Sequence, residues 1–217
     1  VAVLDSGHDV SSSVGDWSGT FWSNLGETPG NGIDDDGNGL IDDVHGYDFV
    51  EDDGDPDADN VHGIHVASIC TARANNGEGL AGVASGARLM VLKAFDAGGS
   101  FPSSGPYPGH LAAATALLYA VDHGADVINN SWHNGIVPSP VINDAIDYAI
   151  DNGVHVVFAA ANFGVDEAWP PEHPDVIAVA GVDSDGVRGD WGGESSNFGP
   201  WVDLAAGGTS IITAGPD

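Results

Sequence analysis

The sequence predicts an α/β fold in which helices flank a doubly wound, mostly parallel β-sheet. Short apolar and β-branched runs alternate along the chain with longer stretches of helical pattern. The chain has 217 residues, of which 42% are hydrophobic, and this is enough for one sizeable core. We therefore expect residues 1–217 to form a single domain.

The predicted elements follow one another at regular intervals. Strands are expected at residues 1–5, 87–95, 125–132, 154–160, 176–181 and 201–206, with a further short strand at 45–49. Helices are expected at residues 63–74, 111–123 and 139–152, and Gly124 and Gly153 end the last two. Residues 6–61 are rich in Gly, Asp, Asn and Ser, which predicts a long surface excursion.

Polar residues follow three of these strands. Asp5, Ser131 and Asn162 each stand at or just after a predicted strand end. Because ligands of doubly wound sheets bind at the carboxyl ends of the strands, these side chains are expected to converge at one crevice.

Two histidines lie at the start of the first predicted helix. The acidic, turn-forming residues 51–59 precede the run NVHGIHVASIC, so the helix must begin at a sharp boundary. His62 lies at this boundary and His65 one turn further along. Histidines in such positions are often structural, and a functional role is the alternative. The residues elsewhere in the chain decide between these two interpretations.

Charge excludes several classes of partner. Lys and Arg number 4 against 33 Asp and Glu, a formal net charge of −29, so a nucleic acid or an anionic membrane would be repelled. No apolar run approaches the roughly 20 residues of a membrane span. The single cysteine, Cys70, excludes an internal disulfide. The acidic excess also predicts stabilisation by salt or by bound cations.

A calcium site is predicted in residues 31–43, NGIDDDGNGLIDD. Carboxylate and amide oxygens recur there at alternate positions before a glycine, the spacing of calcium-binding loops. The expected ligands are Asp34, Asp36, Asn38, the carbonyl of Leu40, and Asp42 or Asp43. The motif is not a full EF-hand, because His45 stands where the closing acid is expected. An acidic solvated turn is the alternative.

Three motifs together resemble the subtilisin-like serine proteases. VAVLDSG is similar to the aspartate motif of that family, HGIHVAS to its HGTHVAG motif, and AAANFG to its AAAGN motif. The segments GADVINNSW, WPPEHPDVIAVAGVD and SSNFGPWVDLAAGG are also similar, in the same order, so the resemblance covers nearly all of residues 1–217.

The resemblance implies a role for each matching residue. Asp5 would be the triad acid, His62 the general base, and Asn162 the oxyanion donor. One wall of the substrate cleft would be formed by Ser131, Trp132 and His133, with residues 98–101 opposite. The back of the primary specificity pocket would be formed by Ala159, Ala160 and Ala161. The family also implies a peptide or protein substrate and a secreted or extracellular location, although this chain contains no signal peptide.

The nucleophile of the family has no match in this sequence. Its serine lies in a GTSMA-like motif that opens a long apolar helix, whereas Gly208, Thr209 and Ser210 follow VDLAAGG directly and no helical pattern comes after them. Relative to the family the chain is expected to be incomplete at both ends and truncated before the serine motif. The missing helix would leave apolar surface uncovered, which predicts self-association.

Three functions are therefore compared below. The first is a serine endopeptidase of the subtilisin type whose nucleophile is absent from this chain. The second is a non-catalytic, calcium-binding, subtilase-like module. The third is an esterase that uses another serine near His62.

The sequence also departs from the family at single positions. The family has small residues where this chain has Ser68, Ala161 and His133, and a threonine where it has Ile64.

Overall fold

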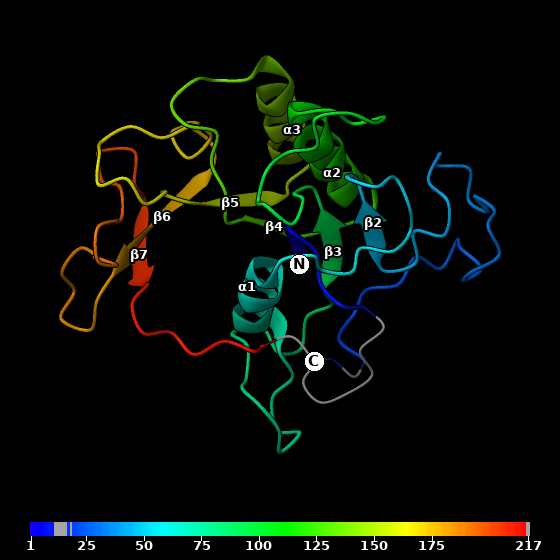
Figure 1. Cartoon of the computed structure of the whole chain (residues 1–217), viewed down its shortest axis with the longest axis horizontal. Helices are drawn as coiled ribbons and strands as arrows, with labels where there is room; N and C mark the ends of the chain where they lie inside the picture. The colour runs from blue at the N-terminus through cyan, green and yellow to red at the C-terminus, as the bar shows by residue number, and fades with distance from the viewer. Residues whose placement is uncertain (11–16, 18, 216–217) are drawn as a thin grey trace.

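The structure, a computed structural model, describes residues 1–10, 17 and 19–215 (Figure 1). Seven parallel strands form one sheet, which confirms the predicted α/β fold class. In sheet order they are β2 (Gly46–Asp48), β3 (Met90–Lys93), β1 (Ala2–Asp5), β4 (Val127–Asn130), β5 (His155–Ala159), β6 (Ile177–Val182) and β7 (Leu204–Gly207).

In the described part of the chain, three helices cover the two faces of this sheet. α2 (His110–Asp122) and α3 (Pro140–Asp151) pack against each other on one face, and α1 (Val61–Thr71) lies on the other (Figure 1). The larger apolar core joins α2 and α3 to strand residues such as Leu4, Ile128 and Phe158. A smaller core lies on the α1 side and includes Val3 and Ala67.

The period of a strand explains where Asp5 points. Leu4 belongs to the core under α2 and α3, whereas Val3 belongs to the core under α1. Successive side chains of a strand alternate between faces, so Asp5 shares the α1 face with Val3. β1 lies in the middle of the sheet, between β3 and β4, and Asp5 is its last residue. A carboxylate is therefore held at the carboxyl edge of a buried central strand.

The ten elements lie where they were predicted, with ends that differ by up to three residues. α1 begins at Val61, two residues earlier than expected, because the side chain of Asn60 caps its first turn. No helix in the described residues is both long and apolar enough to cross a membrane.

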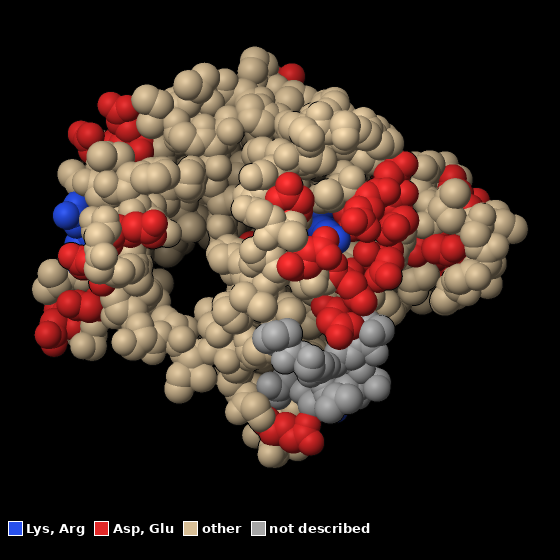
Figure 2. All heavy atoms as spheres, viewed as in Figure 1, with Lys and Arg blue, Asp and Glu red and all other residues tan. Residues whose placement is uncertain are grey.

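One part of the sheet is not covered on the α1 side. All four residues of β7 are exposed, and Leu204 retains 58% of its accessible surface. Figure 2 shows an opening at this place, between the β6–β7 edge, the C-terminal segment and α1. After β7 the described residues 208–215 form neither a helix nor a strand.

Candidate active site

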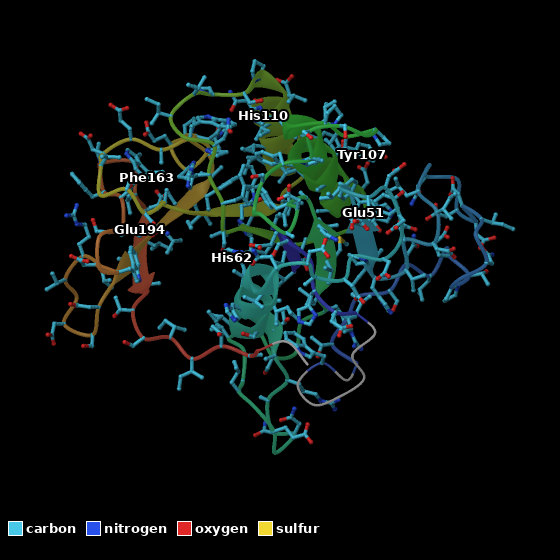
Figure 3. The ribbon with its side chains drawn as sticks, viewed as in Figure 1. Glu51, His62, Tyr107, His110, Phe163 and Glu194 are labelled. Atoms are coloured by element: carbon cyan, nitrogen blue, oxygen red, sulfur yellow. The ribbon has the colours of Figure 1, made fainter. Side chains whose placement is uncertain are left out.

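A buried carboxylate and a partly exposed imidazole form the centre of the site. Nδ1 of His62 lies 2.7 Å from Oδ1 of Asp5. The Asp5 side chain is 4% exposed and that of His62 is 55% exposed. Figure 3 shows His62 at the amino end of α1, next to the carboxyl edge of the central strands. The two residues predicted from separate motifs therefore meet.

Local hydrogen bonds fix the start of α1 against the end of β1. Asn60 Oδ1 accepts the backbone N–H of His62 at 2.9 Å. Ser6 Oγ accepts the N–H of Gly63 and donates to the carbonyl of Asn60, both at 3.0 Å. A Cβ at Gly63 would lie 2.2 Å from the carbonyl oxygen of Gly7, so only glycine allows this approach. The start of α1 is thus held by Ser6, the residue that directly follows Asp5.

The carboxylate of Asp5 affects both the pKa of the His62 imidazole and the choice of ring nitrogen that carries the proton. The hydrogen bond to Asp5 raises the pKa of His62, burial of the ring opposes this change, and the negative charge of Asp5 adds to it. Because Nδ1 donates to Asp5, the neutral ring carries its lone pair on Nε2. Nε2 is therefore the atom that can accept a proton from a reacting group.

A cleft of about 410 Å³ brings the predicted residues together. Its lining includes Asp5, His62, Ser131, Trp132, His133 and Asn162, which come from four separate segments of the chain. His65 is not part of this lining. Asp5, Ser131 and Asn162, which were predicted to converge at the carboxyl ends of the strands, thus line one cleft together with His62.

A second hollow of about 340 Å³ adjoins the cleft and shares Ser131 and Asn162 with it. Its lining includes the three predicted pocket residues Ala159, Ala160 and Ala161 and contains no charged side chain. It lies on the uncovered part of the sheet, over β5, β6 and β7. Its chemistry suits an apolar side chain.

The turn that presents Asn162 is strained and held from a distance. Ala161 has φ 73°, a conformation that costs an L-residue with a Cβ about 1 kcal/mol or more. Asn197, which is fully buried, accepts the N–H of Phe163 at 2.8 Å, and its own N–H donates to the carbonyl of Ala161 at 2.9 Å. No described residue accepts a hydrogen bond from the Asn162 side-chain amide. Asn197 was not identified from the sequence, because nothing in its own segment indicates a partner 34 residues earlier.

His133 occupies the cleft wall beside this turn. Its ring packs edge-on against Phe163, with 4.7 Å between ring centroids. Nδ1 accepts the N–H of Gly135 at 3.2 Å, and burial lowers the pKa of the imidazole. His133 is therefore a neutral, partly apolar surface of the cleft at neutral pH.

No serine of the described residues is hydrogen-bonded to Nε2 of His62. Ser6 is engaged with Asn60 and Gly63, and the hydroxyl of Ser131 accepts from Asn129 at 3.1 Å. Ser210 follows β7, is exposed and has φ 55°, and no helix follows it in the described residues. Among the described residues, Nε2 of His62 therefore has no serine hydroxyl as a hydrogen-bond partner.

The acidic loop gathers a different set of carboxylates from the one predicted. Oxygens of Glu27, Asp36 and Asp43 lie within 4.8 Å of one another, and Glu27 and Asp43 are buried. Of the predicted ligands only Asp36, and Asp43 as an alternative to Asp42, belong to this cluster.

The remaining predicted ligands fold the loop itself. Asp34 accepts three backbone N–H groups, from Gly37, Asn38 and Gly39, and Asp42 accepts those of Asn31 and Gly32. The amide oxygen of Asn38 accepts the N–H of Leu40. The structure therefore puts Asp34 and Asp42 in turns.

Carboxylate oxygens are the hard ligands that a calcium ion prefers. No lysine or arginine in the described part of the chain pairs with Glu27, Asp36 or Asp43. Within residues 1–10, 17 and 19–215, the only basic neighbour at ion-pair distance is His123, whose Nε2 lies 3.9 Å from Asp43. A bound cation would relieve the repulsion among these acids. A second group, Asp147, His173 and Asp175, has ligand atoms equally close but two of its three residues are exposed.

Comparison with known proteins agrees with these observations. The family model described as "Subtilase family" matches residues 1–216. The chain is 39% identical over 171 residues to the thermophilic serine proteinase of Bacillus sp. (strain AK1), covering 78% of this chain and 40% of that protein. It is 36% identical over 174 residues to thermitase of Thermoactinomyces vulgaris, covering 80% and 58%.

A solved structure shows the same fold. The crystal structure of a cold adapted subtilisin-like serine proteinase matches with a TM-score of 0.72 and 23% identity, covering 99% of this chain and 64% of that chain. The chain spans less than two thirds of each of these relatives.

Proposed function

This chain belongs to the subtilase family of serine proteases, and we propose that it supplies the acid, the base, the oxyanion donor and the substrate cleft of a subtilisin-type serine endopeptidase. The observation that carries this proposal is the 2.7 Å contact between Asp5 and His62 in a cleft that also contains Asn162. A buried carboxylate behind an imidazole is the arrangement that activates a serine for attack on a peptide carbonyl.

Asp5, His62 and Asn162 each have a defined chemical role in this proposal. Asp5 keeps the proton of His62 on Nδ1 and stabilises the imidazolium as it forms. Nε2 of His62 accepts the proton of the serine hydroxyl and returns it to the leaving amine. The amide of Asn162 donates to the oxyanion of the tetrahedral intermediate. Within this same family, loss of such a donor lowers kcat by about 10²- to 10³-fold, and this is a known magnitude for the family.

We infer that the nucleophile serine itself is absent from these 217 residues. The two serines that line the cleft with His62, Ser6 and Ser131, have other hydrogen-bond partners, and no helix follows Ser210 in the described residues. This observation also favours the second candidate, a non-catalytic module that binds peptide without cleaving it. The third candidate, an esterase, needs a serine in the cleft, and Ser6 and Ser131 both line the cleft with His62. Ser6 is engaged with Asn60 and Gly63, so Ser131 is the better candidate.

The substrate proposed is an extended peptide with an apolar side chain at the position before the scissile bond. Backbone groups of residues 131–133 could pair with it as an added strand, and the uncharged hollow behind Ala159, Ala160 and Ala161 would receive the apolar side chain. A secreted or extracellular location is proposed from family resemblance alone.

The cofactor proposed is a calcium ion held by Glu27, Asp36 and Asp43. Glu27 and Asp43 are buried, and the carboxylate oxygens of all three residues lie within 4.8 Å of one another. None of the three has a lysine or arginine partner among the described residues. Such an ion would brace the loop that precedes β2 rather than take part in the reaction.

A peptidyl chloromethyl ketone with an apolar terminal residue tests the proposed site. Such a reagent alkylates a histidine that lies beside a bound peptide, and the adduct can be mapped by mass spectrometry. We expect modification of His62 ahead of the other eight of the nine histidines. Asp5→Asn should slow it, because a neutral amide no longer holds the proton firmly on Nδ1 and does not stabilise positive charge on the ring. Equal modification of all exposed histidines would show that no peptide-binding catalytic cleft exists.

A fluorophosphonate separates the candidate functions. This reagent labels only an activated serine, so the 217-residue chain should remain unlabelled and should not cleave casein. Labelling of one serine would show that the nucleophile is present here, and its position would distinguish Ser131 from Ser210. Modification of His62 without any serine labelling supports a site that lacks only its nucleophile.

A further inference from the structure

Lys93 is the only lysine of the chain, and it is buried. It ends β3, and its ammonium contacts two carboxylates: Oδ2 of Asp48 at 2.8 Å and Oδ2 of Asp59 at 2.7 Å. Asp48 is fully buried, and the Asp59 side chain is half exposed. Burial of one cation between two acids is costly unless the pairing is close, and here both contacts have hydrogen-bond length.

The two carboxylates bracket one strongly acidic loop. Asp48 ends β2, Asp59 immediately precedes the N-cap of α1, and residues 49–58 between them contain Glu51, Asp52, Asp53, Asp55 and Asp57. Figure 2 shows acidic side chains gathered on this face around a basic one. Like charges in one short loop repel one another, and the ammonium of Lys93 offsets this repulsion at both ends of the loop.

The loop leads directly to the catalytic base. Asp59 is followed by Asn60, whose Oδ1 accepts the N–H of His62 and whose Nδ2 donates to the carbonyl of Ala97 at 3.1 Å. Lys93 also lies beside the exit of β1, since it pairs with Asp5 in the sheet register and a Cβ at Gly7 would lie 3.1 Å from its Cδ. One side chain therefore touches the segment after Asp5 and the segment before His62.

We propose that Lys93 is a positioning residue that holds Asp59, and through it Asn60 and His62, so that the imidazole reaches Asp5. This inference rests on the function proposed above. The ammonium neutralises Asp48 and Asp59, closes the acidic loop, and fixes the chain one residue before the helix cap. Lys93 does not touch a substrate or a reacting atom.

The ionisation of Lys93 supports this role. Burial alone would lower its pKa, but the hydrogen bonds and the charges of Asp48 and Asp59 outweigh burial and raise it. The side chain is therefore a permanent cation over the pH range in which His62 titrates.

Asp59→Asn tests the inference with a mild change. The residue is half exposed and Lys93 keeps Asp48, so the variant should fold. Asp55→Asn is the matched control, because it removes the same charge from an exposed position in the same loop without a contact to Lys93. The measurement is NMR of histidine ring protons, with the signal of the Nδ1 proton of His62 assigned by its absence in His62→Ala.

The expected result differs between the two variants. Asp59→Asn should broaden or remove the hydrogen-bonded Nδ1 proton signal and move the pKa of His62 toward its ordinary value, whereas Asp55→Asn should leave both unchanged. Equal spectra for the two variants would overturn the inference. A wild-type protein without this signal would instead remove the Asp5–His62 pair, and with it the proposed function, so the two failures are distinguishable.

Variants of Lys93 give an independent test. Lys93→Met keeps most of the volume of the side chain but leaves the buried carboxylate of Asp48 without a cation. We expect loss of the His62 signal together with a lower melting temperature. Lys93→Arg keeps the charge and should restore the signal at least in part. If Lys93→Met folds and keeps the signal unchanged, Lys93 has no positioning role.

Discussion

Gly63 lies against Gly7 so closely that a Cβ on Gly63 would meet the Gly7 carbonyl oxygen at 2.2 Å. The start of α1 is pressed onto the chain leaving β1, and His62 stands next to this contact. The distance between Asp5 and His62 is therefore set by backbone packing as well as by their own hydrogen bond.

The first prediction concerns this contact. Gly63→Ala should push α1 away from the end of β1, lower the free energy of unfolding by about 1–3 kcal/mol, and weaken the Asp5–His62 hydrogen bond. Gly86→Ala is the control, because a Cβ there meets nothing within 4 Å. Denaturant unfolding and chloromethyl ketone modification of His62 would measure the two effects. A Gly63→Ala protein as stable and as reactive as the Gly86→Ala protein would contradict this account of the packing.

The second prediction concerns pH. In the folded protein Asp5 raises the pKa of His62 above its ordinary value of 6.5. The group binds its proton more tightly when folded, so its contribution to stability is complete below pH 6.5 and is lost as the pH rises through the folded pKa. The free energy of unfolding should therefore fall over that interval, and the fall should be smaller in His62→Gln.

Chemical denaturation of both proteins at a series of pH values measures this difference. Subtracting the two curves isolates His62 from the other histidines. A difference curve that is flat, or that rises with pH, would show that the folded pKa is not raised. The same pKa sets the pH above which Nε2 is free to act as a base.

The third prediction concerns the strained turn before Asn162. Ala161 has φ 73°, so Ala161→Gly should raise the free energy of unfolding by about 0.5–1 kcal/mol. Ala160→Gly, at a neighbouring position without positive φ, should lower it. Melting temperatures of the two variants measure this contrast. Two shifts of the same sign would indicate that the turn is not strained at Ala161.

The sequence predicted the elements well because strands and helices leave local signals. Short apolar and β-branched runs located the strands, glycines marked the ends of two helices, and the acidic turn-forming residues 51–59 marked the start of the first helix. The motif resemblance located Asp5, His62 and Asn162. Contacts that depend on the fold left no such signal. Asn197 holds residues 161–163 from a segment 34 residues away, and Lys93 joins acids from two sides of the acidic loop.

The predicted calcium loop shows the same limit in more detail. The alternate acids of residues 34–42 predicted a shell made within one short loop, and in the structure Asp36 and Asp43 lie together with Glu27. Glu27 enters the cluster from outside the motif, since its carboxylate accepts the N–H groups of Asp35 and Asp36. Only the folded loop could bring it there.

The fourth prediction concerns calcium. Added calcium should raise the melting temperature and a chelator should reverse the change, with a gain of about 2.7 kcal/mol when free calcium is 100 times its dissociation constant. Glu27→Gln should abolish the response if the folded cluster binds the ion, whereas Asp34→Asn should preserve it in part. Sodium chloride at matched ionic strength controls for general screening of the acidic surface. No response to calcium or chelator would remove the site.

The fifth prediction concerns the uncovered sheet face at β7. Leu204 and Ile212 are strongly exposed, and apolar surface of this kind favours contact between two copies of the chain. Sedimentation velocity should show association that increases with protein concentration and that decreases in Leu204→Glu and Ile212→Glu. Val83→Glu is the control, because Val83 is more exposed than either and lies in a loop after α1. A monomer at high concentration would exclude this face as a site of self-association, and an equal effect of Val83→Glu would mean that added charge, rather than loss of the β7 contact, keeps the copies apart.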